Sequence, residues 1–180
     1  MLRTLGLGLC LALGGGVFGC ASAPKTATQR AELHETASQT VAQMTARDPG
    51  LQTLLDQSAG YLVFPEVKQG GFVVGGAGGK GVLFEKGRPV GYAELSQASV
   101  GAQIGGQKYA EIVVIRDQFA LDRVRASNID LGAQASAVIL KAGAAASTRF
   151  NESGLAVFVE PTAGAMVNAS LTGQRVRITG

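Results

Sequence analysis

Glycine spacing constrains the fold of this chain more than any other feature. Twenty-six of its 180 residues are glycine, about twice the average usage. After Tyr61, short runs of β-forming residues alternate with glycines, which is typical of a many-stranded sheet with tight connections. A turn is predicted at 161–164. Strands are predicted near residues 61–64, 71–75, 81–85, 90–95, 98–105, 110–116, 134–140, 155–160, 165–170 and 174–179.

Helical periodicity is confined to three segments. Residues 28–47 carry one apolar stripe, two shorter helices are predicted at 51–57 and 117–126, and Asp117 is a suitable N-cap for the last. The stripe of the first helix consists of Leu33, Ala37, Val41 and Met44. The sequence therefore predicts an α+β fold, with N-terminal helices packed on a glycine-rich, mainly antiparallel β-sheet or barrel-like core.

The N-terminus has the pattern of an export signal. Arg3 precedes an uncharged apolar run over residues 5–18, which is shorter than the roughly 20 residues that span a bilayer as a helix. Val17-Phe18-Gly19-Cys20 resembles a bacterial lipoprotein lipobox. The resemblance implies cleavage before Cys20, diacylglyceration of its thiol and acylation of the new amine, for example with palmitate. The alternative is an ordinary cleaved signal with an incidental cysteine.

This interpretation divides the chain into a signal peptide (1–19), a tether (20–27) and a folded domain (28–180). Because Ala21 is not the aspartate that retains many lipoproteins in the inner membrane, we expect an exported, lipid-anchored protein of the outer membrane. Cys10 lies in the discarded segment, so the mature chain has no second cysteine for a disulfide.

The segment Gly76-Ala77-Gly78-Gly79-Lys80-Gly81 matches the G-x-G-x-x-G pattern of dinucleotide-binding sites in residue type, but not in its sequence context. Such a motif needs a helix directly after it, whereas here a β-like run follows. A Walker A loop would need glycine at Val74 and serine or threonine at Gly81. The glycines are explained either by a neighbouring backbone that lies close to them or by an open surface for a flat ligand such as an acyl chain.

Catalytic and metal-binding patterns are weak. His34 is the only histidine and is expected on a solvated helix face, so no metal, cofactor or enzymatic activity is predicted. The strand glutamates Glu66, Glu85, Glu94 and Glu111 are expected at solvated edges. The net charge of +3 is spread thinly, with a local group at Lys80, Lys86 and Arg88, which argues against nucleic acid as a partner.

Several motifs in order resemble the SYLF domain, a phospholipid-binding module. They begin with Ala59–Val67, Gly70–Gly76 and Gly79–Leu83, and continue through Ala98–Gln107, Asp130–Ser136 and Gly164–Gly173. One departure lies at Ser153-Gly154-Leu155, where Ala156–Glu160 follow in place of the hydroxyl-rich stretch usual in the family. The actin binding attributed to some eukaryotic members is not expected in an exported protein.

The resemblance implies that residues 28–180 form a SYLF-like lipid-binding domain, which binds anionic membrane phospholipid. The expected basic contacts are Lys68, Lys80, Lys86 and Arg88, beside a glycine-rich surface of Gly75, Gly76, Gly78, Gly79 and Gly81. The amphipathic helix at 28–46 is expected to add membrane contact. The alternative function is a structural or assembly lipoprotein whose glycine-rich sheet binds an envelope protein partner.

Overall fold

The computed structural model describes residues 24–71, 74–100, 106–126, 129–131, 137–139, 141–163 and 173–179. Two helices open the fold, α1 (Ala27–Arg47) and α2 (Pro49–Gln57). Thr26 caps α1 in a reciprocal capping box with Gln29, which satisfies two of the backbone N–H groups at the helix start. Asp48 ends α1 and caps α2, where its side chain accepts from the Gly50 N–H and Pro49 takes the first helical position.

Within the described residues, eight strands form one sheet of order β5-β8-β3-β2-β1-β4-β7-β6. All neighbouring pairs are antiparallel except β6 with β7. The strands are β1 (Gly60–Gly71), β2 (Val74–Glu85), β3 (Arg88–Val100), β4 (Gln107–Ile115), β5 (Ile129–Asp130), β6 (Ala137–Ile139), β7 (Leu155–Ala163) and β8 (Gln174–Thr179). The predicted α+β class with helices on a glycine-rich, mainly antiparallel sheet is confirmed.

The central strands are longer than the sequence predicts. Strand β1 runs through Pro65 because a bulge there removes this proline from both hydrogen-bonded ladders, and a bulge is one of the few places where a strand accepts proline. Strand β2 runs through its glycines, and β3 joins the runs predicted at 90–95 and 98–105. Glycine therefore marks sites of close packing or open surface in these strands rather than their ends.

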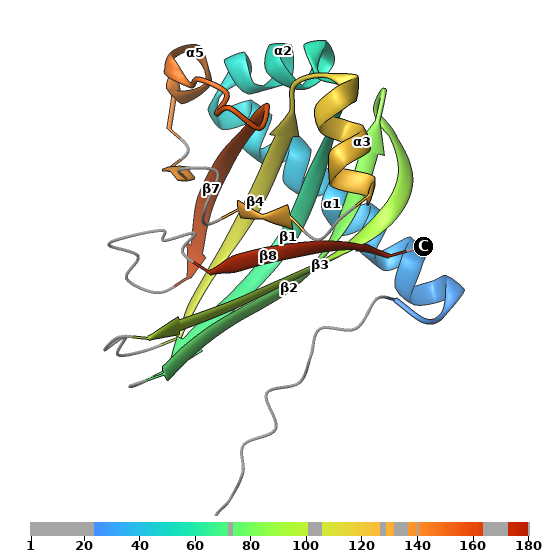
Figure 1. The fold of residues 1–180 in the computed structure, drawn as a ribbon, viewed down its shortest axis with the longest axis vertical. Helices are drawn as coiled ribbons and strands as arrows, with labels where there is room; N and C mark the ends of the chain where they lie inside the picture. Colours follow the sequence, from blue (N-terminus) through green and yellow to red (C-terminus); the bar gives the residue numbers. More distant parts are fainter. Residues whose placement is uncertain are drawn as a thin grey trace, which may run out of the picture.

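The sheet curls into a half-barrel (Figure 1). Its two edge strands, β5 and β6, are consecutive in the sequence, with only residues 131–136 between them. In a flat sheet the first and eighth strands would lie about 34 Å apart, whereas the seven residue steps from Asp130 to Ala137 span at most about 25 Å. The connection therefore requires curvature.

Apolar side chains cover both faces of the curled sheet. The inner face packs against α3 (Gln118–Ala126) through Leu62, Phe64, Leu121 and Val124, among others. The outer face packs against α1, α2 and α5 (Ala144–Ser147). Figure 1 shows α1 and α2 behind the sheet and α3 in front of it. Asp48 fixes α5 to the N-terminal helices, because its Oδ2 accepts the Ala145 N–H at 2.7 Å.

The expectations for the turn at 161–164, for the apolar stripe of α1 and for His34 are wrong. Pro161–Ala163 lie inside β7 and not in a turn; the predicted strand at 165–170 lies outside the described residues. The apolar stripe of α1 packs against the sheet, with Ala37 and Met44 fully buried, so this stripe is not free to enter a membrane. His34 is half-buried and stacks on Tyr92 of β3 at a ring-centroid distance of 5.4 Å, because the start of α1 lies against the strands.

Candidate functional site

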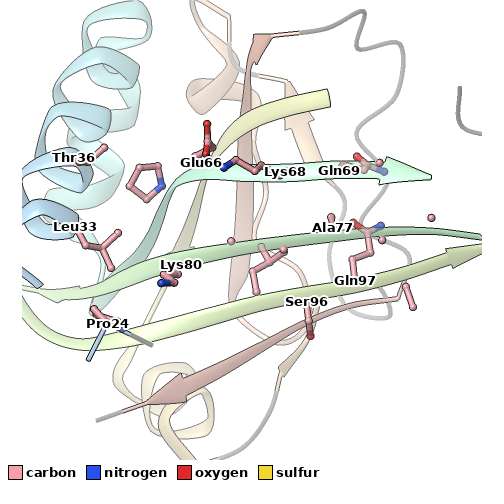
Figure 2. Close-up of a pocket in the computed structure, with 18 of the residues that line it drawn as sticks. Pro24, Leu33, Thr36, Glu66, Lys68, Gln69, Ala77, Lys80, Ser96 and Gln97 are labelled. Atoms are coloured by element: carbon pink, nitrogen blue, oxygen red, sulfur yellow. Dashed lines mark ion pairs between the residues drawn. The ribbon is translucent and has the colours of Figure 1, made fainter. Parts of the chain in front are cut away.

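A groove of about 1010 Å³ lies between the first half of α1 and the middle of the sheet. Helix α1 contributes Leu33 and Thr36, which Figure 2 shows beside the strands. The strands contribute small side chains and bare backbone. The full lining is Pro24, Gln29, Glu32, Leu33, Thr36, Pro65, Glu66, Lys68, Gln69, Gly70, Gly75, Gly76, Ala77, Gly78, Gly79, Lys80, Leu95, Ser96, Gln97 and Ala98.

Strand register explains why the sheet is hollow beneath α1. Gly70 pairs with Gly76 and Gly76 with Ala98, while Lys68 pairs with Gly78 and Gly78 with Ser96. Paired residues of antiparallel strands share a face. In β2, Gly76 and Gly78 lie on the same face as Val82 and Phe84, which pack in the outer core. Near Val82 and Phe84, large side chains fill the space between the sheet and the helices. Near Gly76 and Gly78, the glycine, serine and alanine residues leave this space open.

The other glycines of β2 have the opposite environment. A Cβ on Gly81 would lie 2.6 Å from two ring carbons of Phe64, and one on Gly79 would lie 3.0 Å from the Glu66 carbonyl oxygen. A Cβ on Gly76 would come no closer than 3.3 Å to any atom, and one on Gly70 would meet nothing within 4 Å. Both explanations of the glycine-rich segment therefore apply, each to a different set of positions.

Two lysines bind one carboxylate at the groove, and a third lysine is its neighbour in the strand register. Glu66 accepts from the Nζ atoms of Lys68 and Lys108, each at 2.9 Å, and these hydrogen bonds, Lys108 first, lower the pKa of its carboxyl group. Lys80 is the cross-strand neighbour of Glu66 and of Glu94, but Glu94 is bound to Arg177. We call Lys68, Lys80 and Lys108 the lysine cluster; Glu32 of α1 also lines the groove.

The structure separates the predicted basic residues into two pairs. Lys68 and Lys80 line the groove, with Gly75, Gly76, Gly78 and Gly79 (Figure 2). Lys86 and Arg88 lie at the β2–β3 hairpin, about 20 Å along the strand from Lys80 at the usual rise per residue. Gly81 packs against Phe64 and does not line the groove. Cys20 lies outside the described residues.

Sequence reasoning missed Lys108 and the role of α1. Lys108 is placed opposite Lys68 by the β1–β4 register, which pairs residues 40 positions apart and has no local signal. The helix was recognised from its periodicity, but nothing in that pattern shows which strands it covers.

A second polar site lies inside the half-barrel. Glu111 was expected at a solvated edge, but it is fully buried on β4, and both of its carboxyl oxygens lie 2.9 Å from Nε2 of Gln174 on β8. These strands are four places apart in the sheet, so the contact crosses the concave face. Burial raises the pKa of Glu111 to about 7 and also raises the pKa of Tyr109.

Comparison with known families supports the resemblance drawn from the sequence. Residues 96–179 match the family described as "Ysc84: Las17-binding protein actin regulator", whose domain is the SYLF domain. The predicted resemblance to SYLF-domain proteins is thus confirmed over residues 96–179, from within β3 to the end of β8, while the motifs at 59–83 lie outside the match. No curated protein matches the chain. Among the helices that the structure describes, none combines the length and apolarity needed to cross a bilayer.

Proposed function

We propose that this protein is an exported lipoprotein, anchored through Cys20, whose domain binds anionic phospholipid in the groove beneath α1. The matched family supports a lipid-binding or actin-regulating role, and the groove favours the first. The glycine and alanine residues that line the groove on the strands leave room for an acyl chain. The lysine cluster beside them can bind a phosphate. The observation that carries the proposal is this juxtaposition of a glycine-floored groove with Lys68, Lys80 and Lys108.

The anchor and the groove have separate roles in this proposal. Several acyl chains on Cys20 would hold the protein on the membrane without further help. Lysines near an anionic surface each contribute about 1 kcal/mol, which is too little for attachment but enough to select among lipids. The domain then senses or handles lipid on a membrane where the anchor already holds it.

The two basic pairs provide a matched experiment, since each double variant removes two positive charges. The chain from Cys20 onward, with Cys20→Ser to prevent coupling, is mixed with anionic or neutral vesicles and separated by flotation. Loss of two contacts of about 1 kcal/mol each predicts roughly 30-fold weaker binding to anionic vesicles for Lys68→Ala/Lys80→Ala. Lys86→Ala/Arg88→Ala should bind nearly as the parent does.

Equal losses in both double variants would mean that net charge matters and the groove does not. Binding of the parent to neutral and anionic vesicles alike would remove the anionic lipid from the proposal. Absence of binding to either would favour the alternative, a protein partner in the envelope.

A further inference from the structure

The start of the described chain is fixed at the groove. Pro24 is buried and lines the groove, and Figure 2 shows it beside the strands below Leu33. Its carbonyl oxygen accepts from Nε of Arg30 at 3.4 Å. The following residue, Lys25, donates its backbone N–H to Oε1 of Gln29 at 2.9 Å. The described chain therefore begins at the edge of the groove.

Only four residue steps separate Pro24 from Cys20. A fully extended chain advances at most about 3.6 Å per residue, so the Cα atom of Cys20 lies within about 14 Å of the Cα atom of Pro24. If Cys20 carries the lipid, the membrane surface that holds it must be equally close to this edge of the groove.

We infer that the groove binds an acyl chain of an anionic phospholipid drawn from the same leaflet in which Cys20 is anchored. This inference rests on the proposed function. A second bilayer could reach the Pro24 edge of the groove only by approaching the anchoring membrane to within about 14 Å. The lysine cluster, on the same face of the sheet, then lies at headgroup level of the anchoring membrane.

The chain contains no tryptophan, so a single introduced one can report where lipid lies. Thr36→Trp places a reporter on α1 at the groove, and Phe119→Trp is the control, because Phe119 is 72% exposed on α3 across the sheet. Cys20, as the only cysteine of the processed chain, couples to a maleimide lipid in vesicles. Brominated anionic phospholipid quenches any tryptophan that it contacts.

With brominated phospholipid in the anchoring vesicles, the Thr36→Trp protein should lose most of its fluorescence and the Phe119→Trp protein little. With brominated phospholipid only in a second vesicle population, neither should be quenched. A Gly/Ser insertion of about 30 residues after Ala23, which spans about 30 Å on average, should allow quenching from the second population at Thr36→Trp.

Quenching of Thr36→Trp by the second population without the insertion would overturn the inference, as would equal quenching of the two reporters in the anchoring vesicles. Quenching by a brominated anchor lipid alone would mean that the protein's own acyl chain occupies the groove, which also overturns the inference.

The unanchored Cys20→Ser chain separates the two proposals. If it binds anionic vesicles but the anchored Thr36→Trp protein is not quenched, the inference fails and the proposed function stands. If the unanchored chain does not bind, the proposed function itself fails.

Discussion

Replacing Glu111 by glutamine should stabilise the protein at alkaline pH and have little effect in acid. The carboxyl group is fully buried, and its described polar partner is the Gln174 amide. Oε1 of that amide is itself buried and has no hydrogen-bond partner among the described residues. A protonated Glu111 could donate to it, whereas an ionised one could not.

The magnitude follows from the pKa of Glu111. Burial raises this pKa from an ordinary 4.5 to about 7, so the folded state binds the proton more tightly than the unfolded state. The contribution of Glu111 to stability is therefore fully present below pH 4.5, falls as pH rises, and is lost above pH 7. At about 1.4 kcal/mol per pH unit, the loss from one end of this window to the other is about 3 kcal/mol.

Glu111→Gln keeps the hydrogen bond to Gln174 and does not titrate. Its free energy of unfolding, measured by urea denaturation and circular dichroism, should match that of the parent near pH 4.5. Near pH 8 it should exceed the parent value by about 3 kcal/mol. Glu66→Gln is the control, since ion pairs with two lysines lower the pKa of Glu66 and the variant should gain nothing at high pH. A difference between Glu111→Gln and the parent that stays constant over this pH range would refute the reasoning.

Three other predictions concern packing, capping and the anchor. Gly81→Val should lower the melting temperature markedly, because even its Cβ would lie 2.6 Å from the Phe64 ring, whereas Gly70→Ala, with nothing within 4 Å, should melt near the parent; equal melting temperatures would contradict this account. Asp48→Ala should cost about 2 kcal/mol or more in urea denaturation, since it removes a helix cap and leaves the buried Ala145 N–H unpaired; Asp56→Ala, exposed on α2, is its control. Cys20→Ala should abolish incorporation of a fatty-acid analogue in cells, and equal labelling of parent and variant would disprove lipidation at this residue.

Local signals predicted the elements that depend on neighbouring residues. The three longer helices lie close to their predicted ranges, and Asp117 caps α3 as expected, with its Oδ1 accepting the Ala120 N–H at 2.9 Å. The capping preferences and the 3.6-residue period that led to these predictions act within one or two turns.

Features set by register and curvature could not be predicted in this way. The burial of Glu111 depends on a partner 63 residues away on a strand that is not its neighbour. Lys68 and Lys108 meet at Glu66 because β1 pairs with β4. The groove exists because α1 crosses the small residues of β1, β2 and β3, and helical periodicity does not specify this crossing.

The short edge strands have a consequence for self-association. Long exposed strand edges recruit further chains and promote aggregation, and very short edge strands are one protection against this. Here β5 has two residues and β6 has three, and they pair with part of the outer edges of β8 and β7. Both belong to one stretch, 129–139, so a single proteolytic cut or destabilising substitution there would uncover both ends of the sheet at once. Loss of this stretch would therefore expose backbone N–H and C=O groups of both β8 and β7 to pairing with another chain.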